Sequence, residues 1–176
     1  NNELRNGREV NFATASFGQG IEMNPIQLVR AFCALANGGK LVRPYLVDKI
    51  VENDKVTETK PEISEPIISQ ATVSQISAML VSVVVNGYGK AAGIPGYYIG
   101  GKTGTAQVPE GGTYSADKTI QSFIGYAPAF DPKFVILVKL DNPKAKTAEY
   151  SATPIFHDMA EYIINYQQII PDYKTK

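Results

Sequence analysis

The chain has 176 residues, of which seventeen are basic and seventeen are acidic, so its formal net charge is zero. A neutral chain lacks the positive surface that binds nucleic acid or an anionic membrane, so we expect a local binding site and no nucleic-acid partner. Its single cysteine, Cys33, excludes an internal disulfide, and one cysteine with one histidine is too few for a zinc site. The apolar neighbours of Cys33 predict a small buried side chain.

The first ten residues are polar and charged, which indicates a loop and not a secretion signal. The longest apolar run, residues 76–85, contains two serines and is too short to span a bilayer. We therefore expect the chain as written to be soluble.

Three helices are predicted. The first begins at Asn24, because asparagine is a favourable N-cap, Pro25 suits the first helical position and Gln27 can complete a capping box. The second covers residues 69–85, and the third begins at residues 153–154. We expect two apolar rows of the third helix to lie on a sheet and the polar tail from residue 171 to fray. The rows consist of Ile155, Met159 and Ile163, and of Phe156, Ala160 and Ile164.

The remaining regular segments predict strands. Residues 45–59 alternate between apolar and polar side chains around a turn at 52–55, which is typical of a hairpin. Residues 97–108, 119–127 and 134–140 are strand-like, and their short connections favour antiparallel neighbours. The apolar run at 134–138 predicts a central strand covered on both faces. These elements together predict an α/β (α+β) fold in which helices flank an antiparallel sheet.

Chemistry concentrates in the run Gly101-Lys102-Thr103-Gly104-Thr105. In a strand, Lys102 and Gly104 share one face while Thr103 and Thr105 share the other. Gly104 lets another backbone or a ligand approach closely. If this strand is a sheet edge, an extended peptide could pair with it, the threonine hydroxyls could hold a carboxylate, and a backbone N–H could stabilise an oxyanion.

Two other interpretations of this run are weaker. It could be only a glycine-rich strand end without a role. From Gly96 to Thr103 it also has the letters of a phosphate-binding loop, Gly-x4-Gly-Lys-Thr. A phosphate-binding loop leads into a helix, whereas residues 104–109 disfavour one, so a nucleotide site is not expected.

The wider sequence resembles a known family. Lys102-Thr103-Gly104 is similar to the third signature motif of penicillin-binding proteins and serine β-lactamases. Its extension through Thr105-Ala106-Gln107 resembles the class B penicillin-binding proteins. Residues 16–39, 85–97 and 122–129 are similar to the family in the same order, and residues 94–97 favour the division, or septal, type. The resemblance covers residues 12–160.

This resemblance implies a peptidoglycan D,D-transpeptidase that cross-links cell-wall stem peptides through an acyl-serine, binds β-lactams and needs no cofactor or metal. It implies that Lys102 supports proton transfer around the nucleophile. Thr103 and Thr105 would bind the carboxylate of the substrate, and the backbone N–H of Thr105 would form part of the oxyanion hole. The strand from Gly104 through Ala106 and Gln107 would align the peptide.

The family nucleophile is not found in the sequence. The family places it in a Ser-x-x-Lys motif at a helix start, accompanied by a Ser-x-Asn motif, and no Ser-x-Asn occurs here. The single Ser-x-x-Lys, from Ser115 to Lys118, follows the Lys-Thr-Gly strand in a predicted loop, so we do not expect Ser115 to be the nucleophile.

We therefore expect residues 1–176 to be the C-terminal portion of a penicillin-binding transpeptidase domain with an incomplete sheet. The chain would be inactive alone and would need the missing N-terminal part of the same protein. That parent would be membrane-anchored and would act at the extracytoplasmic face of a bacterial membrane. An open sheet edge in the isolated chain would favour self-association.

Two other kinds of function stay open for the parent protein. The parent could be a D,D-carboxypeptidase or β-lactamase, or it could be a β-lactam sensor or another non-catalytic binding module of the penicillin-binding fold. The sequence departs from the family at residues 149–152, which read Glu-Tyr-Ser-Ala. The family commonly has a glycine pair here, shortly before the last helix.

Overall fold

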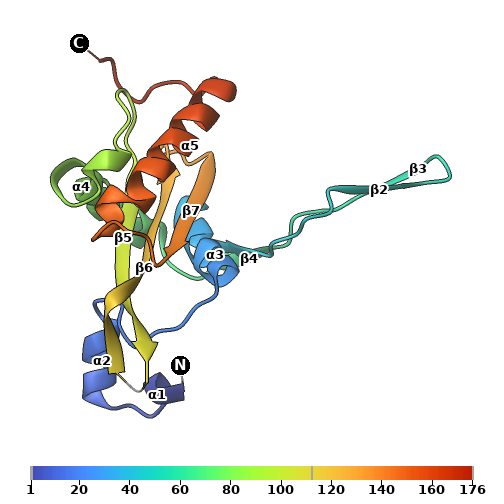
Figure 1. Cartoon of the computed structure of the whole chain (residues 1–176). Coiled ribbons are helices and arrows are strands. Elements are labelled where there is room, and N and C mark those ends of the chain that lie inside the picture. The colour runs from blue at the N-terminus through green and yellow to red at the C-terminus, as the bar shows by residue number, and fades with distance from the viewer. Residues whose placement is uncertain (1, 112, 176) are drawn as a thin grey trace.

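The computed structural model describes residues 2–111 and 113–175 (Figure 1). Its core is an antiparallel three-stranded sheet in the order β5 (Gly100–Glu110), β6 (Thr113–Ala127) and β7 (Phe134–Asp141). The predicted antiparallel neighbours are therefore confirmed. Strand β5 begins three residues later and ends two residues later than predicted, and β6 is longer than predicted, because the two strands continue as a paired ribbon towards the turn at Gly111.

The prediction of a central strand at residues 134–138 is wrong for the residues that the structure describes. There, β7 pairs only with β6, and β6 is the central strand. The apolar run instead reflects coverage of both faces, because α3 (Pro25–Ala36) and α5 (Ala152–Tyr166) both contact β7. Burial on two faces favours a continuous apolar strand whether or not both of its edges are paired.

Helix α5 packs against one face of the sheet (Figure 1). Phe156, Ala160 and Ile164 are buried, and the ring of Phe156 lies 4.7 Å from that of Phe123 on β6. The expectation that Ile155 and Met159 also lie on the sheet is wrong, since they are 40% and 45% exposed. Successive helical residues differ by about 100°, so only one of two adjacent rows can face the sheet fully.

The other face of the sheet carries α3 and α4 (Gln70–Asn86). The predicted capping box is confirmed, because Gln27 N–H donates to Asn24 Oδ1 at 2.9 Å and Asn24 N–H donates to Gln27 Oε1 at 3.0 Å. A buried hydroxyl pair, Ser77 Oγ and Tyr126 Oη at 2.8 Å, joins α4 to β6. Burial raises the pKa of Tyr126, although the bond to Ser77 opposes the rise, so this phenol stays neutral.

The predicted hairpin is confirmed as β2 (Lys49–Glu52) and β3 (Lys55–Glu58), which project from the body of the molecule (Figure 1). Asn53 and Asp54 at its tip have φ values of 47° and 63°, as a tight hairpin turn requires. Lys49 lies opposite Glu58, and Glu52 opposite Lys55, so opposite charges face each other across the strands.

Several elements near the N-terminus and beside the hairpin differ from the expectations. The first ten residues, predicted as a loop, contain α1 (Asn2–Arg5) and the start of α2 (Glu9–Ala15). No residue of α2 is buried, so its sequence lacks the apolar row that would have predicted a helix. The pair β1 (Lys40–Val42) and β4 (Ile63–Pro66) was also not predicted, because these short strands meet across the intervening hairpin.

The C-terminal tail is attached and does not fray at residues 171–173. The N–H groups of Asp172 and Tyr173 donate to Gly96 O at 2.9 and 3.3 Å. Tyr98 N–H donates to Asp172 Oδ2 at 2.7 Å. The tail therefore holds the segment that follows the 3-10 turn η1 (Lys90–Ala92) and leads into β5. Among the helices of residues 2–111 and 113–175, none is long and apolar enough to cross a membrane.

Candidate active site along strand β5

Strand β5 presents the predicted run at an edge of the sheet. In the part of the chain that the structure describes, β5 pairs only with β6. Lys102 lies opposite Ile124, and Thr103 lies opposite Phe123, whose ring packs on α5. Because opposed residues of antiparallel strands share a face, the predicted separation of Lys102 and Gly104 from Thr103 and Thr105 is confirmed.

Glycine at position 101 lets β5 approach β6 over a buried ring. A Cβ atom at Gly101 would lie 2.4 Å from Cζ of Phe123, which is fully buried. A Cβ atom at Gly104 would lie 2.7 Å from Ser122 Oγ, which is the end of a small side chain. A side chain at position 101 would therefore meet a rigid ring, whereas a side chain at position 104 would meet a small group that can move. The two glycines lie on either side of Lys102 along the strand.

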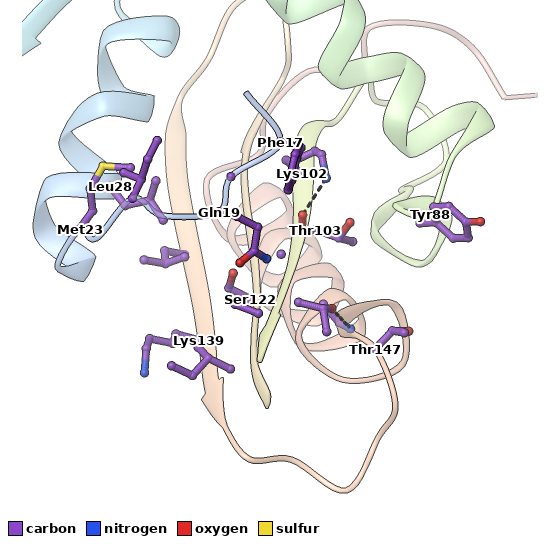
Figure 2. Close-up of a pocket in the computed structure, with 18 of the residues that line it drawn as sticks. Phe17, Gln19, Met23, Leu28, Tyr88, Lys102, Thr103, Ser122, Lys139 and Thr147 are labelled. Atoms are coloured by element: carbon purple, nitrogen blue, oxygen red, sulfur yellow. Dashed lines mark hydrogen bonds between the residues drawn. The ribbon is translucent and has the colours of Figure 1, made fainter. Parts of the chain in front are cut away.

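A cleft of about 1010 Å³ runs along β5, and Figure 2 shows the residues around it. Lys102 is exposed in this cleft, and its ammonium donates one hydrogen bond, to Thr103 O at 2.8 Å. Phe17, Gln19 and Ser122 line the cleft on the same side of the sheet as Lys102 (Figure 2). The site thus offers a solvent-accessible cation together with the side-chain amide of Gln19 and the hydroxyl of Ser122.

The hydroxyl of Thr105 is fixed by a second segment. Ala148 N–H donates to Thr105 Oγ1 at 3.2 Å, which places the 3-10 turn η2 (Ala148–Tyr150) against β5. Because Thr105 Oγ1 already accepts this bond, its own O–H remains a donor. A hydroxyl in this state suits an anionic acceptor such as a carboxylate.

The structure brings five of the six predicted positions to the cleft, namely Lys102, Thr103, Gly104, Thr105 and Ala106. Gln107 is not among the lining residues, and its Nε2 donates to Ser115 O at 3.3 Å. Sequence reasoning gave no role to several further lining residues, which lie far from β5 along the chain. These are Phe17, Gln19, Met23, Leu28, Tyr88, Thr147, Glu149 and Tyr150.

Ser115 does not resemble a helix-borne nucleophile. It lies in β6 and not in the predicted loop, and its Oγ accepts from the N–H of Asp117 at 3.4 Å and of Lys118 at 3.2 Å. Ser115 and Lys118 are three residues apart in a strand, where an odd separation puts side chains on opposite faces. The shared face that a Ser-x-x-Lys pair has on a helix is therefore missing here.

Cys33 is half-buried in α3, so the prediction of a buried side chain is only partly confirmed. Burial raises the pKa of its thiol, which favours the unreactive protonated form. His157, the only histidine, lies in α5 as predicted.

Known proteins share both sequence and fold with this chain. The family described as penicillin binding protein transpeptidase domain matches residues 1–161. Stage V sporulation protein D of Bacillus subtilis is 43% identical over 144 residues, covering 80% of this chain and 22% of that protein. The peptidoglycan D,D-transpeptidase FtsI homolog of Mesostigma viride is 34% identical over 180 aligned positions, covering 93% of this chain and 30% of that protein.

A solved structure agrees with these matches. Penicillin-binding protein 3 of Mycobacterium tuberculosis, complexed with ampicillin, has a TM-score of 0.80 and 34% identity over 89% of this chain and 38% of that chain. The predicted fold class is thereby confirmed. This chain spans 22% and 30% of the length of the two curated relatives. Since the family match extends over nearly the whole chain, the protein belongs to the penicillin-binding protein transpeptidase family.

Proposed function

We propose that this chain supplies the Lys-Thr-Gly strand of a peptidoglycan D,D-transpeptidase that cross-links stem peptides and binds β-lactams. The observation that carries the proposal is the edge of β5 that has no partner strand among the described residues, where Lys102, Thr103 and Thr105 line one cleft. A peptide that pairs with this edge would form backbone hydrogen bonds with β5, and its side chains would contact the residues that line the cleft.

Each residue would act at a defined stage of acyl transfer. The hydroxyls of Thr103 and Thr105 hold the terminal carboxylate of the stem peptide. The backbone N–H of Thr105 stabilises negative charge on the carbonyl oxygen that is attacked. The ammonium of Lys102 supports the electrostatics around the serine nucleophile and relays protons there. Gly104 and Ala106 leave room for the peptide backbone. Gln107 extends the pairing edge.

The nucleophile itself would belong to a preceding part of the same domain, so residues 1–176 would form the C-terminal portion and be inactive alone. Neither a Ser-x-Asn motif nor a helical Ser-x-x-Lys pair is present in this sequence. Because stem peptides lie outside the cytoplasmic membrane, the parent would act at its extracytoplasmic face, anchored by a segment outside this chain. The name of the Mesostigma viride relative supports the transpeptidase assignment, and the sporulation and FtsI names favour a septal role.

Labelling with a fluorescent penicillin tests this function. The 176-residue chain and the complete gene product are each incubated, and the adduct is measured on a denaturing gel and by intact mass. We expect the complete product alone to be labelled, at a serine outside residues 1–176. Labelling of the short chain would contradict the placement of the nucleophile. A complete product without label would favour a non-catalytic function.

We also expect the isolated chain to self-associate. The outer edge of β7 has no partner strand in residues 2–111 and 113–175, and an unpaired edge can accept a strand from a second copy. Light scattering over a wide range of concentrations should give a mass that rises above that of the monomer. A constant monomer mass is the result that would argue against an accessible edge.

A further inference from the structure

One carboxylate, that of Glu149, belongs to a residue that lines the same cleft as Thr103 and Thr105 and has no role in the proposed acyl transfer. Glu149 is half-buried, lines the cleft, and has no hydrogen bond or ion pair with the residues that the structure describes. It directly follows Ala148, whose N–H donates to Thr105 Oγ1 at 3.2 Å. The backbone of Glu149 is therefore fixed next to a residue that contacts the hydroxyl of Thr105.

The cleft that Glu149 lines has further groups that suit a cation. Tyr88 and Tyr150 line the same cleft and are 75% and 71% exposed, so their rings are accessible to a ligand. Tyrosine rings attract ammonium groups, and a partly desolvated carboxylate is stabilised by an ion pair. The two lysines of the cleft, Lys102 and Lys139, lie on the opposite face of the sheet from Thr105 and η2. Neither lysine neutralises Glu149, since neither forms an ion pair with it.

We infer that Glu149, with Tyr88 and Tyr150, binds an ammonium group of the peptide substrate; this inference rests on the proposed function. In an extended peptide, side chains on one face are two residues, about 7 Å, apart along the strand. If the terminal carboxylate contacts Thr103 and Thr105, the side-chain amine of the residue two positions earlier can reach Glu149. An amine brought in by the acceptor peptide has the same chemistry and is the other source.

The test uses the complete gene product and the isosteric variant Glu149→Gln. The donor peptide ends in Lys-D-Ala-D-Ala and is compared with the same peptide acetylated on the lysine amine. We expect Glu149→Gln to lower kcat/KM for the free amine by about fivefold, as for a partly exposed ion pair. Hydrolysis of the acetylated peptide and acylation by benzylpenicillin, which has no amine, should not change. Glu161→Gln, which removes the same charge from an exposed position on α5, should not discriminate between the peptides.

The outcomes distinguish the donor peptide from the acceptor as the source of the amine. They also distinguish this inference from the proposed function. If hydrolysis is unchanged but Glu149→Gln raises KM for glycine as the acceptor amine, the acceptor is the ligand and the inference holds. Equal losses on free and acetylated peptides would indicate a structural role and overturn it, as would no change for either amine. Absence of benzylpenicillin acylation in the unmodified protein overturns the proposed function, and the inference falls with it.

Discussion

Replacing Lys102 with alanine in the complete gene product should lower the rate of acylation by a fluorescent penicillin by about 10²- to 10³-fold. Losing a preorganised charged group from a reacting centre has effects of this size. The fold should survive, because Lys102 is exposed and its side chain makes a single hydrogen bond, to Thr103 O. The measurement is the second-order rate constant for adduct formation, together with thermal unfolding to show that the variant is folded.

Lys139→Ala is the matched control for Lys102→Ala. Lys139 is the other lysine that lines the cleft, and it lies on β7, where it pairs with Asp141. Both substitutions remove one positive charge from the same cleft, so a general electrostatic effect would lower both rates alike. We expect Lys139→Ala to change the rate by less than about threefold. A Lys102→Ala rate that equals the Lys139→Ala rate would show that Lys102 has no special place in the chemistry.

The sequence predicted best those features that depend on neighbouring residues. The capping box at Asn24 and Gln27 and the turn at Asn53 and Asp54 follow from local side-chain and backbone preferences. The separation of Lys102 from Thr103 on β5 follows from strand alternation, which holds for any strand. The local pattern was therefore enough to place the proposed chemistry on the correct faces.

The missed features depend on contacts between distant segments. The apolar residues at 134–138 indicated that this strand is buried, but they could not show which edges of β7 are paired. Tyr88 and Glu149 reach the cleft only because β5, η2 and the end of α4 meet in space. The attachment of Asp172 to Gly96 joins residues that are polar or glycine, so no periodic pattern indicates it. The sequence thus located the strand that lines the cleft, whereas the residues on the other walls of the cleft could be identified only from the fold.

Replacing Gly101 with alanine should destabilise the 176-residue chain by about 1–3 kcal/mol, because overpacking of a rigid core has a cost of this order. The new methyl group would lie 2.4 Å from Cζ of Phe123. That ring cannot move away easily, since it is fully buried and lies 4.7 Å from the ring of Phe156 on α5. The strain must therefore displace β5 or α5. Urea unfolding, extrapolated linearly to water, measures the loss.

Gly104→Ala on the same strand distinguishes this clash from a general intolerance of β5 to side chains. Its methyl group would lie 2.7 Å from Ser122 Oγ, which has no hydrogen-bond partner in the described part of the chain and can rotate. We expect a loss of less than about 1 kcal/mol, because the end of a small, half-buried side chain relaxes more cheaply than a packed ring. Equal losses in the two variants would mean that the Phe123–Phe156 contact does not set the position of β5. A larger loss at Gly101 would show that the packed rings beneath β5 resist a side chain at this position.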